Sequence, residues 1–240
     1  MICRAKTEAS HNATPHFTMS SKISTNLKNI RHQIPDHVKL IAVSKTKPAN
    51  QLLEAFDAGQ RAFGENYVQE MCDKQKQLPD SIEWHFIGHL QRNKVKNIAP
   101  FVHWIHAVDS ERLFAEINQA AEKNERTINC LLQIHIAKEE SKFGFSASEV
   151  KAFASAMQDQ ASHSARICGV MGMASFTDDM SLVSTEFKEL KRIFDELKNG
   201  VFSKHEHFCE ISMGMSSDWQ IAVEEGSTMV RIGSAIFGAR

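Results

Sequence analysis

The most regular feature of the chain is an alternation, after residue 19, between short apolar runs and longer amphipathic stretches. Most of the runs are apolar almost throughout, instead of at every second position, which is typical of strands buried on both faces of a parallel sheet. The pattern therefore predicts eight strands, at residues 39–44, 62–64, 84–88, 103–108, 128–136, 166–174, 208–214 and 229–238.

The stretches between the runs carry helix signals. Pro48 opens one stretch and Gly59 closes it, which is the usual distribution of these residues at helix ends. Ser146 and Glu149 have the spacing of a capping box, in which each side chain bonds the backbone N–H of the other residue. A longer stretch ends at Gly200 and carries apolar residues at helical spacing, at Val183, Phe187, Leu190, Phe194 and Leu197. Each stretch is therefore predicted to be a helix.

Strands that alternate with helices predict an α/β protein, a single (β/α)8 barrel of the TIM type, with residues 19–240 as one domain. A doubly wound open sheet is the alternative. The eighth run ends close to residue 240, so we expect the helix that passes through Ile30 to take the place of the last barrel helix. Residues 1–18 are weakly patterned and lack the apolar segment of a secretory signal, and we expect them to be a disordered extension.

The composition narrows the function classes. The 240 residues include 28 basic and 29 acidic side chains, a net charge of −1, which argues against a general nucleic-acid binder. The chain has no apolar run of the length that crosses a membrane. The five cysteines are an odd number without C-x-x-C spacing, and Cys130, Cys168 and Cys209 lie in apolar runs. We therefore expect reduced, packed thiols and a cytoplasmic location.

The carboxyl ends of the strands are where a barrel of this kind carries its chemistry. Lys45 directly follows the first run. Partial desolvation there would lower the pKa of its ammonium group, and the neighbouring cation Lys47 would act in the same direction. A neutral amine is what a Schiff-base lysine needs. The alternative is a lysine that extends from a strand end into water.

Small and hydroxyl-bearing residues follow the last two strands. Residues 214–217 lead from the seventh run into a predicted helix, and Gly233 and Ser234 lie in the eighth run. Backbone N–H groups and hydroxyls at these positions are typical of the phosphate site of a barrel. A capped helix and a tight turn are the alternative. Strands one and eight are neighbours in a closed barrel, so Lys45 next to a phosphate site suggests a ligand that carries an aldehyde and a phosphate.

The chain resembles the pyridoxal 5′-phosphate (PLP) homeostasis protein family. Six segments carry the resemblance, in order from about residue 21 to the end: IAVSKTKP (41–48), FGENYVQE (63–70), WHFIGHLQRNKVK (84–96), AVDSERL (107–113), SKFGF (141–145) and ISMGMSSDWQIAVEEGSTMVRIGSAIFG (211–238). The resemblance implies a barrel like the N-terminal domain of alanine racemase, a fold-type III PLP protein, with PLP as its cofactor.

The resemblance also implies roles for single residues. Lys45 matches the lysine that forms the Schiff base with PLP, and Asn66 matches an asparagine near the ring. Arg231 matches an arginine that faces the pyridine nitrogen. The phosphate-site positions are Ser216, Gly233 and Ser234, with Met213 lining that site. The family usually has threonine where Ser234 stands, and the hydroxyl group is retained.

Arg231 affects which chemistry bound PLP could support. An arginine is always charged and only donates, so it would leave the pyridine nitrogen unprotonated and the ring a weak electron sink. This favours limited racemase chemistry or none. The alternative for Arg231 is an ion pair with Glu224 or Glu225.

Racemisation needs acid–base groups on both faces of the substrate carbon. Lys45 could serve one face, and in alanine racemase a tyrosine serves the other, but the only tyrosine of this sequence is Tyr67. We therefore expect a binding protein for PLP homeostasis that holds PLP without robust catalysis. The alternatives are a small PLP-dependent amino-acid racemase and a cofactor-free barrel that acts on a sugar phosphate. Candidate partners are PLP and apo PLP-dependent enzymes, with no nucleic acid and no membrane, and the chain is expected to be a monomer or weak dimer.

Twelve histidines raise the question of a metal site. Three-residue spacing on a strand places His103 and His106 on opposite faces, and the pair His205 and His207 precedes the seventh strand at the amino end of the barrel. We therefore predict no metal. His89, after the third strand, is a candidate residue at the mouth of the cofactor site.

Overall fold

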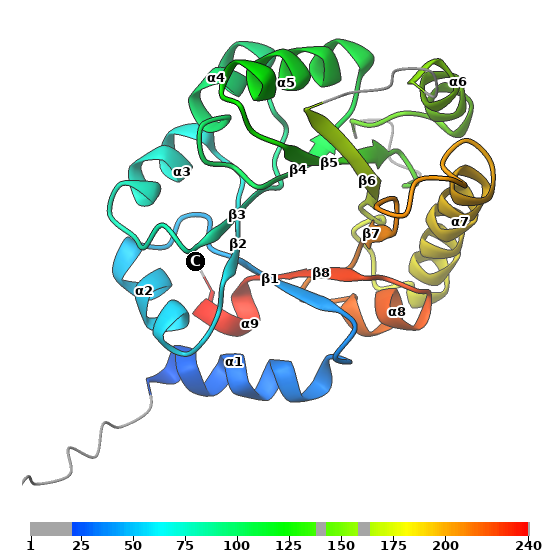
Figure 1. Cartoon of the computed structure of the whole chain (residues 1–240). Coiled ribbons are helices and arrows are strands. Elements are labelled where there is room, and N and C mark those ends of the chain that lie inside the picture. The colour runs from blue at the N-terminus through cyan, green and yellow to red at the C-terminus, as the bar shows by residue number, and fades with distance from the viewer. Residues whose placement is uncertain (1–20, 138–142, 158–163, 240) are drawn as a thin grey trace, which may run out of the picture.

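The strands of the computed structural model form one closed parallel barrel in chain order, in which β8 pairs back with β1 (Figure 1). The structure describes residues 21–137, 143–157 and 164–239. The closed ring confirms the predicted (β/α) barrel and excludes the open sheet. The strands are β1 (Lys39–Val43), β2 (Ala62–Glu65), β3 (Glu83–Phe86), β4 (Trp104–Val108), β5 (Ile128–Ile134), β6 (Ala165–Gly172), β7 (Glu210–Ser212) and β8 (Met229–Ile232).

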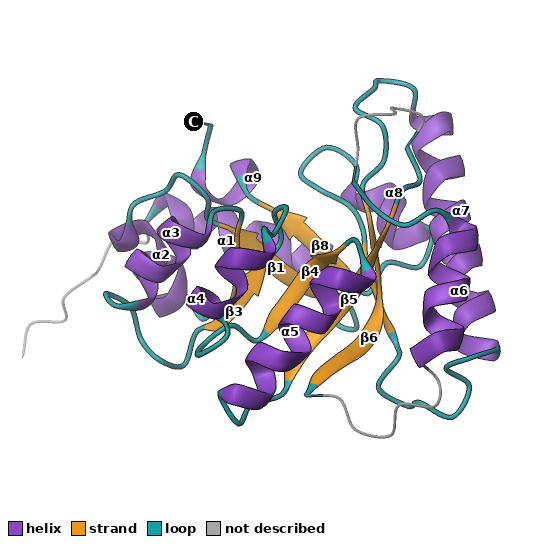
Figure 2. Ribbon diagram, turned by 90° about the horizontal axis from the view of Figure 1, so that it is seen from above, coloured by secondary structure: helices purple, strands orange, loops and turns teal. Residues whose placement is uncertain are grey.

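Helices surround this barrel on its outside (Figure 2). The predicted capping box is present at the start of one of them, since Ser146 N donates to Glu149 Oε2 at 2.8 Å and Glu149 N donates to Ser146 Oγ at 3.2 Å. The helices are α1 (Lys22–Gln33), α2 (Ala49–Asp57), α3 (Val68–Gln75), the 3₁₀ helix η1 (Arg92–Lys94), α4 (Val95–Ile98), α5 (Glu111–Lys123), α6 (Ala147–Met157), α7 (Met180–Asn199), α8 (Trp219–Glu224) and α9 (Ser234–Phe237).

The end of the chain departs from the prediction. The eighth run was expected to be one strand over 229–238, but β8 ends at Ile232 and α9 follows it. Gly233 turns the chain with φ −121° and ψ −69°. Helix α1 packs against α9 and α2 outside β1 and β8 (Figure 1). Asn26 Nδ2 on α1 donates to Ile236 O on α9 at 3.0 Å. As expected, α1 covers the part of the barrel that a full last helix would cover.

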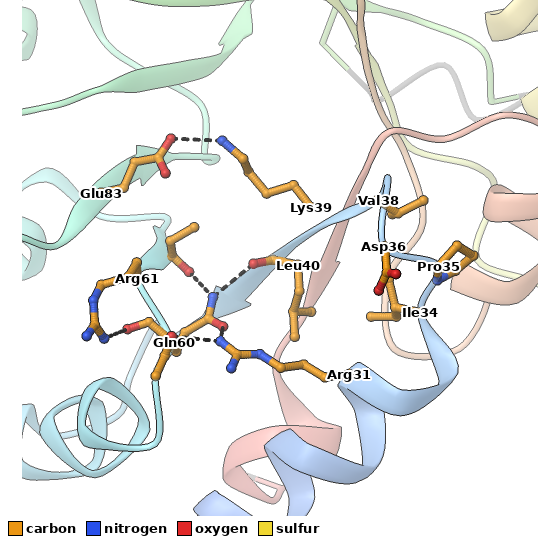
Figure 3. A pocket seen from close by; sticks show the side chains of 12 residues that line it. Arg31, Ile34, Pro35, Asp36, Val38, Lys39, Leu40, Gln60, Arg61 and Glu83 are labelled. Atoms are coloured by element: carbon orange, nitrogen blue, oxygen red, sulfur yellow. Dashed lines mark hydrogen bonds and ion pairs between the residues drawn. The ribbon is translucent and has the colours of Figure 1, made fainter.

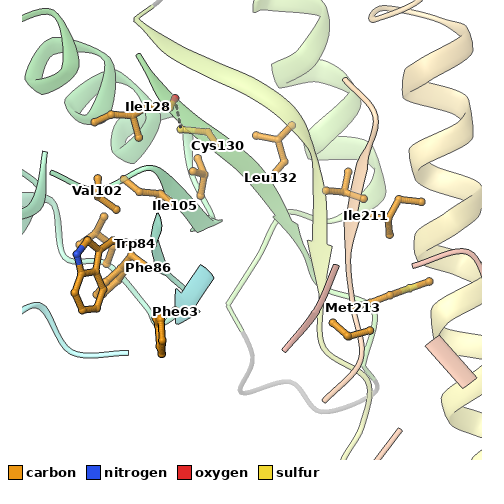
Figure 4. Packing of buried hydrophobic residues seen from close by; sticks show 14 of the residues in the cluster. Phe63, Trp84, Phe86, Val102, Ile105, Ile128, Cys130, Leu132, Ile211 and Met213 are labelled. Atoms are coloured by element: carbon orange, nitrogen blue, oxygen red, sulfur yellow. Dashed lines mark hydrogen bonds between the residues drawn. The ribbon is translucent and has the colours of Figure 1, made fainter. Parts of the chain in front are cut away.

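The core has two parts. Side chains that point outward from the strands pack under the helices and form the larger buried cluster, part of which is drawn in Figure 4. A smaller apolar cluster lies between the strands, inside the barrel. The four described cysteines are free thiols, and burial of Cys130 and Cys168 confirms the prediction for these two. The prediction is wrong for Cys209, which is exposed because it precedes β7 at the rim of the barrel.

Two further expectations concern membrane-spanning segments and residues 1–18. Over residues 21–137, 143–157 and 164–239, no helix combines the length and the apolar character needed to cross a bilayer. The predicted extension at 1–18 lies outside the described residues.

Candidate functional site

A cavity of about 380 Å³ opens at the carboxyl ends of the strands, between the segments that follow β1, β2, β7 and β8. It brings together every predicted binding residue except Met213. Its lining consists of Val43, Lys45, Lys47, Asn66, Ile87, Met173, Met215, Ser216, Ser217, Arg231, Gly233, Ser234 and Gly238. Segments almost 190 residues apart in the chain meet here because β8 closes the ring against β1.

The turn after β1 sets the position of Lys45. Thr46 has a left-handed backbone, with φ +64°, which is rare for a β-branched residue and needs support from its surroundings. The support comes from Glu70 on α3, whose Oε1 accepts a 2.6 Å hydrogen bond from Thr46 N. Lys45 itself is half-buried and lies between this turn and the cavity.

A buried ion-pair cluster lies directly beneath the turn. Lys74 Nζ donates to Ser44 O, Glu65 Oε1 and Glu70 Oε1, each at 2.7 Å. The side chain of Lys74 is 6% exposed and that of Glu65 is 0% exposed. Burial raises the pKa of the Glu65 carboxyl, while the charge and hydrogen bond of Lys74 act in the opposite direction. This cluster was not predicted from the sequence, although Glu65 at the end of an apolar strand was a signal for it.

Lys47 holds the C-terminal segment beside the cavity. Its ammonium group donates to Gly238 O at 3.1 Å and to Ala239 O at 2.9 Å, just beyond α9. Cations are favourable partners for carbonyl groups at a helix end. Its predicted effect on the pKa of Lys45 stays a prediction.

The opposite side of the cavity is formed by the loops after β7 and β8. Ser216 Oγ accepts a 3.3 Å hydrogen bond from Gly233 N, which joins the two loops. A Cβ atom at Gly233 would lie 2.9 Å from Val43 O, so glycine permits the close approach of this loop to β1. Gly214 has φ +93°, and a Cβ there would lie 2.6 Å from the Cβ of Ala222. These constraints fix where the hydroxyls of Ser216 and Ser234 line the cavity.

Arg231 enters the cavity from inside the barrel. It is 4% exposed; Nη1 donates to Ser212 Oγ at 2.6 Å and Nη2 donates to Gly172 O at 3.1 Å. Burial lowers the pKa of Arg231 to about 10, with Asp218 acting in the opposite direction, so the side chain is a cation at neutral pH. The alternative ion pair with Glu224 or Glu225 is absent from the described contacts of Arg231.

Met213 is the one predicted site residue that the structure places elsewhere. Its side chain is fully buried in the larger core cluster and does not line the cavity. The reason is the alternation of side chains along a strand: Ser212 points into the barrel toward Arg231, so Met213 points outward to the helices.

Asn66 separates the Lys45 cavity from a second cavity of about 300 Å³. Its Oδ1 is buried and has no hydrogen-bond partner among the described residues, so it is an acceptor that a ligand can use. Tyr67 and His89 line the second cavity and not the one that holds Lys45. His89 stacks on Phe143 with ring centroids 4.1 Å apart.

The pair His103 and His106 takes structural positions. His103 Nδ1 accepts a 3.1 Å hydrogen bond from Trp84 N, and His106 is buried inside the barrel. Across the part of the chain that the structure describes, no group of three or more His, Cys, Asp or Glu side chains is arranged to hold a metal ion.

Comparison with known proteins places the chain in a family. The family model described as "Alanine racemase, N-terminal domain" matches residues 19–240. The pyridoxal phosphate homeostasis protein of Pasteurella multocida (strain Pm70) is 38% identical over 235 residues, covering 93% of this chain and 98% of that relative.

Solved structures of PipY from Synechococcus elongatus PCC7942 have the same fold. The structure without PLP has a TM-score of 0.84 and 36% identity, and the structure with PLP bound has a TM-score of 0.81 and 34% identity. Each alignment covers 90% of this chain and 100% of PipY. The chain therefore belongs to the alanine racemase N-terminal domain family and, within it, to the pyridoxal phosphate homeostasis proteins.

Proposed function

We propose that this protein binds PLP in the Lys45 cavity and serves PLP homeostasis as a binding protein and not as an enzyme. The observation that carries the proposal is the meeting of Lys45, Arg231 and the Ser216–Gly233 loop contact around one cavity. The name of the Pasteurella multocida relative and the PLP-bound structure of PipY support the same ligand.

The residues of the cavity fit the chemistry of PLP. A volume of about 380 Å³ lies within the range of small-molecule sites. Hydroxyl groups of Ser216 and Ser234, next to the backbone of the β8–α9 turn, are suitable donors for a phosphate. The buried Oδ1 of Asn66 is available to accept a hydrogen bond from the ligand.

Each residue has a distinct proposed role. When bound, PLP supplies an aldehyde with which the Lys45 amine condenses reversibly, releasing water and leaving a Schiff base. The turn at Thr46 holds that amine at the cavity, and Ser216, Gly233 and Ser234 bind the phosphate. Met213 is not part of this proposal, because it packs in the core.

Two features favour binding over catalysis. Arg231 is a buried cation that only donates hydrogen bonds, so a ring nitrogen facing it stays unprotonated and withdraws electrons weakly. Tyr67, the only tyrosine of the chain, lines the neighbouring cavity and is 58% exposed. It is therefore poorly placed to move a proton on the face opposite Lys45, as a racemase requires.

The cellular setting is part of the proposal. Reversible binding suits a protein that stores PLP and passes it to apo PLP-dependent enzymes, acting as a monomer or weak dimer. The free thiols of Cys72, Cys130, Cys168 and Cys209 are compatible with the cytoplasm.

Titration of the purified protein with PLP tests the proposal. The wild-type protein should develop the absorption band of a protein-bound Schiff base, and Lys45→Ala should not. Lys94→Ala is the matched control, because Lys94 is an exposed lysine of the neighbouring cavity, and it should keep the band. An unchanged band in Lys45→Ala would defeat the assignment of this lysine.

A further inference from the structure

A row of buried polar side chains runs through the inside of the barrel. His85, His106 and Ser212 are each 0% exposed. His85 Nδ1 lies 2.9 Å from His106 Nε2, and His106 Nδ1 lies 2.9 Å from Ser212 Oγ. Arg231 donates to the same Ser212 oxygen at 2.6 Å, so the row ends at the cavity that holds Lys45.

The other end of the row reaches the amino-terminal side of the barrel. His85 Nε2 lies 3.3 Å from Glu83 Oε1, an electrostatic contact, since Nε2 makes no hydrogen bond among the described residues. Glu83 also accepts from Trp104 Nε1 at 2.7 Å. It pairs with Lys39 at 3.1 Å, as Figure 3 shows. Glu83 and Lys39 line a separate cavity of about 360 Å³. The row therefore connects cavities at opposite ends of the barrel.

The donors and acceptors along the row fix which atom donates in each hydrogen bond. Arg231 can only donate, so Ser212 Oγ accepts from it, and the Ser212 hydroxyl hydrogen is free to point to His106 Nδ1. A neutral His106 then carries its hydrogen on Nε2, where it points to Nδ1 of His85. His85 in turn carries its hydrogen on Nε2, facing the carboxylate of Glu83.

The reverse direction is unfavourable at both ends. Ser212 Oγ would receive hydrogens from both Arg231 and His106, and the Ser212 hydroxyl would have no acceptor among its described contacts. At the other end, a lone pair on His85 Nε2 would face the Glu83 carboxylate. Burial lowers the pKa of both imidazoles, so each carries a single hydrogen at neutral pH.

We propose that Ser212, His106 and His85 form a hydrogen-bond chain of fixed direction that orients the Arg231 guanidinium and couples it to Glu83 at the opposite end of the barrel. Ser212 and His106 are then positioning residues for Arg231. A buried cation is stabilised by oriented dipoles, and here the dipoles all point from the cation toward a carboxylate. The expected effect on PLP binding rests on the proposed function, whereas the hydrogen-bond chain from Ser212 to His85 does not.

The first test uses the protein without PLP. Long-range ¹H–¹⁵N NMR on ¹⁵N-histidine protein reports which ring nitrogen carries the hydrogen, and spectra of His85→Gln and His106→Gln assign the two signals by their loss. The proposal requires neutral rings with the hydrogen on Nε2 of both His85 and His106. Either ring in the Nδ1–H form, or doubly protonated at neutral pH, would overturn it.

The second test measures the coupling over distance. Glu83→Gln removes the terminal charge with little change in shape, and Glu210→Gln is the matched control, because Glu210 begins β7 at the same end of the barrel and bonds Thr228 instead. In the PLP-free protein, Glu83→Gln should shift the ¹⁵N signals of His106 and of the Arg231 side chain, and Glu210→Gln should not. Unshifted signals in Glu83→Gln would refute the coupling.

The third test concerns the bound state. Ser212→Ala leaves Nη1 of the buried Arg231 without its acceptor, and the loss of such a partner should weaken PLP binding by about tenfold. Affinity unchanged within about twofold would show that Ser212 does not position Arg231 for the ligand. A wild-type protein that bound no PLP would refute the proposed function. The NMR test of the His85 and His106 tautomers would then still decide whether the hydrogen-bond chain exists.

Discussion

Replacing Lys74 with methionine should strongly destabilise the protein, because it removes the cation from the buried cluster beneath Lys45. Lys74 makes three charge-assisted hydrogen bonds of 2.7 Å, and its main partner Glu65 is 0% exposed. Leaving one member of a buried ion pair without its partner costs about 3–5 kcal/mol. Most of this cost falls on Glu65, because Glu70 is 23% exposed and can be hydrated.

Urea unfolding followed by circular dichroism measures this loss. Lys74→Met should lower the free energy of unfolding by about 3–5 kcal/mol at neutral pH. Lys76→Met, two residues along the chain at an exposed position, is the control and should stay within about 0.5 kcal/mol of the wild type.

A double variant separates the charge effect from lost packing. Glu65→Gln combined with Lys74→Met removes both charges, so it should recover about 2 kcal/mol or more relative to the sum of the single losses. If Lys74→Met were as stable as Lys76→Met, or if the double variant lost the plain sum of the single losses, the buried charge of Glu65 would not be the cause of the destabilisation.

Three further predictions concern other parts of the fold. Gly214→Ala should lower the free energy of unfolding by about 1–3 kcal/mol in a urea titration, because φ is +93° and a Cβ would lie 2.6 Å from a side chain of α8. The capping hydrogen bonds lower the pKa of Glu149, so its contribution to stability is present above its ordinary pKa of 4.5 and is lost as the pH falls through the lowered value. The difference in unfolding free energy between wild type and Glu149→Ala should therefore shrink in acid, and a constant difference would contradict this. Burial raises the pKa of Cys168 to about 12 and that of Cys130 well above its ordinary value, so a thiol reagent followed by mass spectrometry should modify the exposed Cys209 before either of these two buried thiols.

The architecture could be predicted from the sequence because it depends on local patterns. Near-continuous apolar runs mark strands that are buried on both faces, and the capping box at Ser146 and Glu149 is present as predicted. The end of β8 could not be predicted in this way. Residues 234–237 are mostly apolar, and a short apolar stretch is compatible with either a strand or one turn of helix.

The residues of the candidate site also differ in whether the sequence could predict their positions. The sequence could predict one common site for Lys45, Asn66, Ser216 and Arg231, because the carboxyl ends of parallel strands in a barrel meet on one face. The direction of the Met213 side chain could not, because it depends on which residues of β7 face inward.

Long-range contacts inside the barrel have no sequence signal. The hydrogen bond between His106 and Ser212 joins residues 106 positions apart and exists only because the barrel closes. The Glu65–Lys74 pair differs, because it is local in sequence and a glutamate at the end of an apolar strand is a signal for it, but the burial of the pair depends on how α3 packs on the barrel. Such contacts follow from packing and strand register, which single-sequence patterns do not specify.

The proposed function requires that one lysine, just beyond the end of β1, holds the ligand covalently. Borohydride reduction of the PLP-loaded protein, followed by proteolysis and mass spectrometry, identifies this lysine, because reduction makes the bond permanent at the lysine that formed it. We expect the pyridoxyl group on the peptide that contains Lys45, with the label lost in Lys45→Ala. A label located mainly on another lysine, such as Lys47, or no label at all, would show that Lys45 does not bind PLP covalently.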